Sequence, residues 1–539
     1  MTAPGENTAT AGTLLEVPIS RRRLVLAAAG GLVAGTRLVN PVLARATPPW
    51  SEQLFTLGVA SGEPAPTGVV LWTRLAPDPL AGGGMPDRPV PVRWEVARDS
   101  AMRRVVRRGV ALARPELAHS VHVEVEGLQP AREYWYRFLA GPQDSPVGRT
   151  VTAPAPHALP ASLRFAFASC QDWQNGYWPA YRHLAAEGLD LVVHLGDYIY
   201  EYGPEAKTRP GSPPGRVHEG PEVFSLESYR NRHALYRTDP ALQAAHAAAP
   251  WVVTWDDHEV ENNYADGVPE EGSSPPGDWE TRRANGYRAY YEHMPLRRSS
   301  VPSGSALRLY RRLAWGRLAE LNVLDTRQYR SDQPCGDGLK SCPERLDPEA
   351  TMTGDEQERW LLAGLDASQA RWNVLAQQTI FAEVDFNPAP GSAGAAGLFN
   401  VDQWDGYVAQ RRRISQFLAD RRPANPIVVT GDIHSSWAND VKLDYDDPAS
   451  PTVAAEFVGT SISSDFPAVF IAPVQAALAD NPHVRFFDGL YRGYVRCKVT
   501  PGLWRSDFRA VATVDVPEAP VFTLRSFVVE DGRPGIEPA

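Results

Sequence analysis

The sequence has little cysteine, no excess of positive charge and few long apolar runs. The formal net charge of its 539 residues is −10, which argues against nucleic acid as a general partner, because nucleic-acid-binding proteins present basic patches. A phosphate substrate is not excluded, since bound cations can reverse the local sign of the charge. No internal repeat is visible, which argues against a repeat architecture.

The rest of the composition is that of a soluble globular protein, with 43% hydrophobic and 22% charged residues. The length allows two to four domains and at least one large core. The 49 prolines favour many loops and turns over long helical bundles.

The N-terminus has the features of an export signal. Ser20–Leu26 (SRRRLVL) resembles the twin-arginine signature, and the apolar stretch Leu24–Ala34 follows it. Ala44-Arg45-Ala46 offers a cleavage site with small residues. The alternative is a basic anchor or a transmembrane helix, for which the apolar stretch is short. We therefore expect residues 1–46 to be a Tat signal peptide, the Tat machinery to be a partner, and the protein to be secreted or held at the cell surface.

The four cysteines divide into two pairs. Cys335 and Cys342 bracket a short loop and predict a disulfide, because an exported protein meets oxidising conditions. Cys170 and Cys497 allow two interpretations, either a second disulfide or a thiolate ligand at Cys170 with a buried thiol at Cys497. The second is favoured because Cys170 ends a predicted strand close to other metal-ligand residues.

Residues 50–154 predict a small all-β domain. Strand patterns alternate with turn signals at short spacing. Tyr134, which follows Leu128–Pro130, is typical of the tyrosine corner of a fibronectin-like sandwich. The clearest strands are Gly68–Arg74, Val90–Val96, Val121–Val125 and Tyr134–Leu139. We expect this domain to act as a scaffold.

Residues 160–539 predict an α/β domain in which strands alternate with helices. Thr353 and Glu356 have the spacing of a capping box, and Trp360–Leu365 continues the predicted helix. Residues 202–221 and 265–278 are predicted loops that follow ligand clusters, so each is a candidate rim or lid. The tail, residues 501–539, lacks a helical period and is expected to be extended.

Four apolar runs end in residues that bind metals. Ligands of α/β sheets collect at the carboxyl ends of strands, so these residues are expected to converge on one site. Any one of these residues alone is more often a helix cap, a turn residue or a core residue than a metal ligand. That structural explanation would have to hold independently at all four strand ends, which makes it the weaker one. The pattern therefore predicts a metallohydrolase. The runs are Leu163–Ala168, Leu189–Leu195, Trp251–Thr254 and Ile427–Thr430.

The residue types predict an asymmetric site. Asp197 has two oxygens with which it can bridge two metals, and Cys170, Tyr200 and His434 can join it on one side. A thiolate and a phenolate are both anionic ligands, so this side suits a highly charged ion such as Fe³⁺.

The other side has carboxylates and no evident imidazole ligand. Asp257 and Asp432 favour hard cations such as Ca²⁺, Mg²⁺ or Mn²⁺ over Zn²⁺. His258 is placed to contact a phosphate oxygen or to protonate a leaving group, and we predict that it is catalytic. Asn262 and Asn263 are near the site, where capping and ligation are equally open. No Ser or Thr at a sharp strand-to-helix turn near these clusters suggests a protein nucleophile.

Together these motifs resemble the PhoD family of alkaline phosphatases and phosphodiesterases, a branch of the metallophosphoesterases. They follow the family's order over nearly all of the chain after residue 46. The motifs are Gly58–Pro64, Val70–Arg74, Ser169-Cys170, Gly196–Glu201, Trp255–Glu259, Leu324–Arg330 and Gly431–Ser435.

The resemblance implies a four-layer α/β/β/α metallophosphoesterase domain after the sandwich, with one Fe³⁺ and two Ca²⁺. The implied iron ligands are Cys170, Asp197, Tyr200 and His434. The implied calcium ligands are Asp197, Asp257 and Asp432, with His258 near the phosphate. Some family members close the site with a C-terminal helix, which the extended tail does not predict.

We therefore expect a secreted, monomeric, metal-dependent alkaline phosphatase and phosphodiesterase, in which a metal-bound hydroxide attacks phosphate esters in line. The alternative within the same fold is a phospholipase D that cleaves phospholipid head groups. From another class, a cell-surface binding module could use its 15 tryptophans to contact a polymer around a structural metal. Such a module would hydrolyse no phosphoester.

Overall fold

The structure is a computed structural model that describes residues 53–539, except 207–208, 210, 274–276 and 388–396. By its internal contacts the chain divides into residues 1–47 and Pro48–Ala539, and all described residues belong to the second unit. The predicted signal peptide lies outside the described residues. Among the described helices, none combines the length and the apolar character needed to cross a membrane.

The largest sheet of the described residues has ten strands. Its central strands β9, β10 and β11 are parallel, and β21 joins β9 in the antiparallel direction. In spatial order the strands are β24 (Arg533–Pro538), β23 (Val521–Glu530), β22 (Leu503–Val511), β21 (Arg492–Val499), β9 (Leu163–Ala168), β10 (Leu191–His194), β11 (Pro250–Val253), β1 (Val59–Ala65), β2 (Gly68–Arg74) and β5 (Ser120–Val125).

A second sheet of the described residues has seven strands, and its middle strands are also parallel. Their order is β12 (Arg311–Trp315), β13 (Ala319–Val323), β15 (Trp372–Ala376), β17 (Pro426–Thr430), β19 (Thr452–Val458), β18 (Ser436–Lys442) and β20 (Val484–Asp488). A short pair, β14 (Leu339–Lys340) and β16 (Phe399–Asn400), lies apart from both sheets.

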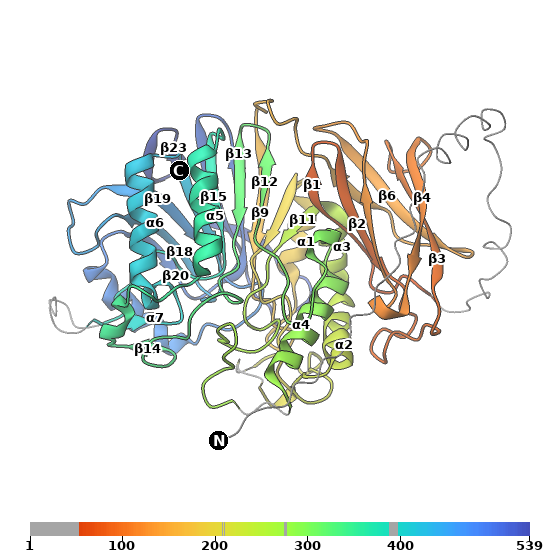
Figure 1. Ribbon diagram of the computed structural model, residues 1–539, viewed down its shortest axis with the longest axis horizontal. Helices are drawn as coiled ribbons and strands as arrows, with labels where there is room; N and C mark the ends of the chain where they lie inside the picture. The colour runs from red at the N-terminus through yellow and green to blue at the C-terminus, as the bar shows by residue number, and fades with distance from the viewer. Residues whose placement is uncertain (1–52, 207–208, 210, 274–276, 388–396) are drawn as a thin grey trace, which may run out of the picture. The chain divides into compact units, whose positions relative to one another are not determined.

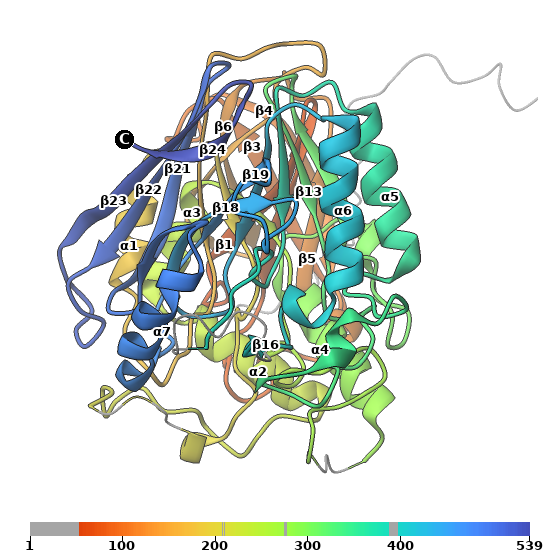
Figure 2. The same ribbon diagram turned by 90° about the vertical axis from the view of Figure 1, so that its left-hand side faces the viewer.

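The two large sheets pack against each other through one face each. Phe165 and Val193 of the first sheet share a buried cluster with Val374 and Val429 of the second. Strands that are apolar on both faces need cover on their other faces as well. Helices supply it, and in Figure 2 α5 and α6 lie on one side of the sheets and α1 on the other.

The outer face of the ten-stranded sheet packs on the helices between β9 and β12. These are α1 (Pro179–Ala186), α2 (Leu226–Arg237), α3 (Pro240–Ala248) and α4 (Trp279–His293). On the seven-stranded sheet, α5 (Gly354–Ala367) and α6 (Val408–Arg421) pack through Leu361 and Ile414. The short helix α7 (Ile471–Ala477) follows β19. The α/β class expected from the sequence is confirmed.

The N-terminal strands form two packed sheets, and one of them is part of the ten-stranded sheet. Strands β3 (Val90–Ala97), β4 (Val105–Ala113), β6 (Glu133–Ala140), β7 (Gln143–Asp144) and β8 (Gly148–Val151) form the smaller sheet, seen on the right of Figure 1. This sheet packs on β1, β2 and β5. Because β1 pairs in parallel with β11, the N-terminal region extends the main sheet. The hydroxyl of Tyr134 accepts a hydrogen bond from the Gln129 amide at 2.9 Å, the contact of a tyrosine corner.

Most predicted elements are confirmed, and one detail is wrong. The strands predicted from the sequence lie within two residues of those observed, the tail forms β22–β24, and α5 contains Trp360–Leu365. Thr353 precedes α5 but makes no side-chain capping bond. Its hydroxyl accepts a hydrogen bond from Gln410, and Glu356 accepts one from Tyr310, so the capping box does not form.

Candidate metal centre

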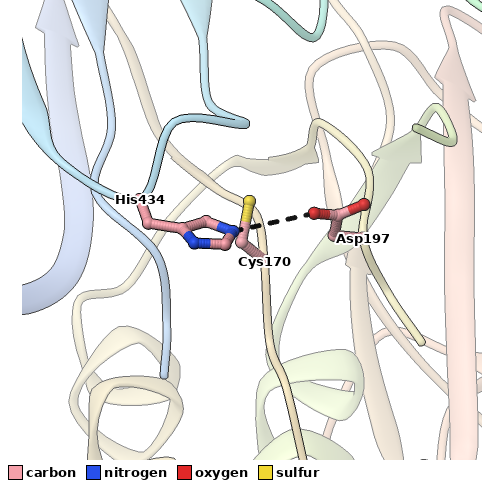
Figure 3. Close-up of side chains that lie close together, drawn as sticks. All are labelled: Cys170, Asp197 and His434. Carbon is pink, nitrogen blue, oxygen red and sulfur yellow. Dashed lines mark ion pairs between the residues drawn. The ribbon is translucent and has the colours of Figure 1, made fainter. Parts of the chain in front are cut away.

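The carboxyl ends of β9, β10, β11 and β17 meet at one place. Cys170 follows β9, Asp197 follows β10, and His434 follows β17 of the other sheet. One ligand atom from each of these three residues lies within 4.8 Å of the other two. Figure 3 shows the three side chains close together. The convergence predicted from the sequence therefore occurs between two sheets rather than along one.

Four of the ligand candidates have left-handed backbones. The φ angles are 59° at Cys170, 55° at Asp197, 65° at Asp432 and 58° at His434. Such angles are uncommon outside glycine and gather where a site imposes them. Each strand thus turns sharply at its end, which directs the side chain toward the junction of the two sheets.

Tyr200 joins the group around Asp197. Its hydroxyl lies 3.0 Å from Asp197 Oδ2 and 3.2 Å from His434 Nε2. Ser464 donates to the same hydroxyl at 2.7 Å. His434 Nδ1 lies 2.8 Å from the carbonyl oxygen of Asp465, which leaves Nε2 facing Tyr200 and Asp197. The four predicted iron ligands are thus brought together.

The protonation state of this group depends on whether a cation is bound. Burial raises the pKa of the Cys170 thiol well above its usual value, and the charge of Asp197 raises it further. The same causes raise the pKa of Tyr200. A cation would reverse this, because a coordinating thiol is deprotonated by its metal. One oxygen of Asp197, Oδ1, is buried without a hydrogen-bond partner among the described residues, as expected of an atom reserved for a cation.

The carboxylates of Asp256, Asp257 and Asp432 form a second group, again with ligand atoms within 4.8 Å of one another. Oxygens of Asp256 and Asp257 are buried and unbonded within the described part of the chain. Burial raises the pKa of Asp432 to about 7, and it raises the pKa of Asp256 well above its usual value. Three acids so close together fit an oxygen-binding hard cation.

Arg327 lies among these acids and is fully buried. Its Nη2 is 3.0 Å from Asp432 and 3.7 Å from Asp257, and its Nε bonds Asp256. Its Nη1 donates to both oxygens of Asp402, at 3.0 and 3.1 Å. Although burial acts to raise it, the charges of Arg327 and His258 lower the pKa of Asp257.

Asp402, Asp256 and Arg327 were not among the predicted site residues. Arg327 lies in the motif Leu324–Arg330, but a guanidinium group does not bind metal cations, so its residue type does not indicate a role at a metal site. Asn263 donates its backbone N–H to Asp257 Oδ2 at 2.6 Å, and Asn262 donates its own to Glu201 at 2.8 Å. Both asparagines therefore support the site through their backbone.

His258 lies on the pocket side of the centre. One ring nitrogen, Nδ1, is 2.8 Å from Glu201 Oε2, and the ring lies 4.1 Å from that of Tyr200 between centroids. Although burial acts to lower it, the charges of Glu201 and Asp257 raise the pKa of His258 well above its usual value.

A pocket of about 790 Å³ opens beside these residues. Tyr200, His258 and His434 line it, and the lining residues Tyr202 and Arg209 come from the first predicted rim loop. The second loop, residues 265–278, contributes no lining residue among those described. The further walls are Asp172, Asn175, Ala206, Ser464–Val469, Ile471, Gly489–Arg492 and Val511–Val514.

The described cysteines form one disulfide and two free thiols. Cys335 and Cys342 form the predicted disulfide. Cys170 and Cys497 are both buried and free, so the alternative second disulfide does not form. The Cys497 sulfur lies 3.5 Å from the Ser506 hydroxyl, away from the centre.

Comparison with known proteins gives consistent matches. The family model described as PhoD-like phosphatase matches residues 165–508, and the model of its N-terminal domain matches residues 42–154. Alkaline phosphatase D from Bacillus subtilis (strain 168) is 51% identical over 524 residues, which are 96% of this chain and 88% of that protein. The solved structure described as PhoD is 50% identical, covers 92% of this chain and 93% of its own, and has a TM-score of 0.86.

Proposed function

The chain belongs to the PhoD-like phosphatase family and is a phosphoric ester hydrolase, and from that premise we propose a secreted, metal-dependent alkaline phosphatase and phosphodiesterase. The observation that carries the metal dependence is two buried groups of candidate ligands, one around Asp197 and one around Asp257. In both groups carboxylate oxygens have no hydrogen-bond partner among the described residues, and Asp197 lies close to both groups. Such groups are stable when they bind cations.

The donor atoms fit two kinds of cation. Cys170, Asp197, Tyr200 and His434 would hold Fe³⁺, because two of them become anionic ligands. Asp197, Asp257 and Asp432 would hold Ca²⁺. The cations would offset the charge of the phosphate and lower the pKa of a water nearby.

The residues of the chain then orient the ester and the leaving group. In this proposal the ester lies in the pocket against Tyr200 and His258, which both line it. A water oxygen forms the new bond to phosphorus and releases a proton to solvent. The bond from phosphorus to the alcohol oxygen breaks in line, and that oxygen keeps the electron pair. A proton from His258 Nε2 neutralises it.

The architecture and location are part of the proposal. We propose that residues 160–539 form the four-layer metallophosphoesterase domain and that residues 50–154 form a β-sandwich scaffold. The ranges matched by the two family models support this division. We also propose Tat export after cleavage near residue 46, and a monomeric enzyme.

The test compares purified protein on p-nitrophenyl phosphate, its bis-ester and phosphatidylcholine. We expect turnover of the first two, and an Asp197→Asn variant to lose more than ~100-fold of kcat/KM. Asp355→Asn, at a side chain that is 80% exposed, is the matched control and should keep wild-type rates. Strong preference for phosphatidylcholine would instead support the phospholipase D alternative.

Elemental analysis of the same preparation tests the cations. We expect iron and calcium, with the calcium at about twice the iron. Zinc in place of both would overturn the assignment of the metals and leave the hydrolase function intact.

A further inference from the structure

Glu201 is not a candidate ligand, but it links the segment that carries Tyr200 to the segment that carries His258. It follows Tyr200 directly in the chain, and its side chain is fully buried. Oε2 lies 2.8 Å from His258 Nδ1, and Oε1 accepts the backbone N–H of Asn262 at 2.8 Å. Both carboxylate oxygens are therefore used, one by the imidazole and one by the turn that follows it.

The imidazole has little freedom in this arrangement. The rings of Tyr200 and Tyr202 lie 4.1 and 5.3 Å from that of His258 between centroids. With Nδ1 held by Glu201, the other nitrogen, Nε2, has no hydrogen-bond partner among the described residues, although His258 lines the pocket. The free nitrogen is thus available to a ligand.

We propose that Glu201 is a positioning residue that presents His258 Nε2 to the leaving-group oxygen, an inference that rests on the proposed phosphoesterase function. The carboxylate at Nδ1 fixes the orientation of the ring and leaves Nε2 as the nitrogen that a ligand in the pocket can contact. In the reaction the proton on Nε2 passes to the alcohol oxygen as the bond to phosphorus breaks. Glu201 keeps its bond to Nδ1 throughout.

Leaving-group dependence tests this role. A poor leaving group needs the proton more than p-nitrophenolate does, because its oxygen holds more charge in the transition state. In Glu201→Gln we expect turnover of diphenyl phosphate to fall ~10- to 100-fold more than turnover of bis-p-nitrophenyl phosphate. The amide oxygen of the substituted side chain can still accept from Asn262, so the fold and the metal content should be unchanged. Glu201→Asp, which retains the carboxylate, should recover part of the loss.

The matched control is Glu261→Gln. Glu261 is also a buried carboxylate on the same segment as His258, but it binds Arg282 at 2.7 Å. It should keep the wild-type ratio between the two diesters. Equal losses on both diesters in Glu201→Gln, or loss of iron from that variant, would overturn the proposal, since either would show that Glu201 serves only the structure or Tyr200. Absence of diester turnover in the wild type would contradict the proposed function instead.

Discussion

Cys170 and Tyr200 are the two side chains that separate this centre from one built of carboxylates and imidazoles alone. Both are neutral groups at ordinary pH, both are buried, and the charge of Asp197 raises the pKa of each. Without a cation they would keep their protons. A bound, highly charged ion would turn them into anionic ligands, and the absorption spectrum of the protein would report this change.

Replacing Tyr200 by Phe tests the phenolate. We expect the variant to lose any visible absorption that arises from charge transfer between tyrosinate and iron, while it keeps the fold. Tyr202→Phe, on the neighbouring pocket wall, is the control and should retain the band. An unchanged spectrum in Tyr200→Phe would remove this residue from the ligand set.

His194, which is not a ligand candidate, allows a test of what burial does to a titratable side chain. Desolvation lowers its pKa to about 3, against about 6.5 in an unfolded chain. As pH falls below about 6.5, the unfolded state gains a proton that the folded state refuses, so stability is lost toward pH 3. The ring stacks on Trp251, which Phe can also do.

His194→Phe removes this dependence. Between pH 7 and pH 5 the wild type should lose about 2 kcal/mol of unfolding free energy relative to the variant. Urea unfolding at both pH values gives the difference directly. Parallel losses in the two proteins would show that His194 takes up its proton in the folded state.

The ligand candidates could be predicted from sequence because each ends an apolar run, but their supporting residues could not. Arg327 comes from a loop and reaches Asp256, Asp257 and Asp432 only after the two sheets have packed. Glu201 stood in a recognised motif, yet its contact with His258 depends on how two loops meet. The residue type and its place at a strand end indicate a candidate ligand, whereas tertiary packing determines which other residues hold that ligand in place.

Among the elements, the turn between β10 and Asp197 depends on one glycine. Gly196 has a φ of +113°, and a Cβ there would lie 2.4 Å from Asp256 Cβ and 2.5 Å from its backbone nitrogen. Neither atom can move without shifting the segment that carries Asp257. The residue therefore brings two ligand-bearing turns into contact.

Gly196→Ala should destabilise the protein by more than ~3 kcal/mol and reduce its calcium content. Gly141→Ala is the control, because that glycine also has a positive φ of 59° but open space around its Cβ. It should cost only ~1 kcal/mol. Thermal unfolding and elemental analysis of both variants separate the effect of backbone strain, which both share, from the effect of the clash with Asp256. Similar losses of stability and of calcium in the two variants would refute the role of that clash.

Strands were predictable here and their assignment to sheets was not. The apolar runs located β9, β10, β11 and β17 to within two residues, because burial on both faces leaves a largely apolar pattern. That β17 belongs to the second sheet depends on long-range pairing, which no local pattern records. The failed cap at Thr353 has the same origin, since Gln410 comes from another helix.

In the molecule as a whole, a group of buried acids lies where the two large sheets meet. Chelation of the cations would leave Asp256, Asp257 and Asp432 with Arg327 as their close countercharge. We expect EDTA treatment to lower the melting temperature and calcium to restore it, with a stabilisation of about 2.7 kcal/mol at a calcium concentration 100 times its Kd.

Scanning calorimetry with and without the chelator measures this effect. Asp432→Asn should show a smaller calcium response than wild type, since one of the acids is neutralised. If the melting temperature were indifferent to both EDTA and calcium, the acidic group would have to be stable without a divalent cation.

The topology of the ten-stranded sheet also affects how the protein folds during its synthesis. Its strand β9 pairs on one side with β10, which follows soon after it, and on the other with β21, which comes from near the end of the chain. During translation, β9 therefore keeps one edge open until the ribosome has released almost everything else, and such an edge invites pairing with other chains. A polypeptide of this kind gains from being finished and folded where chaperones are at hand, in keeping with the proposed export of a folded protein.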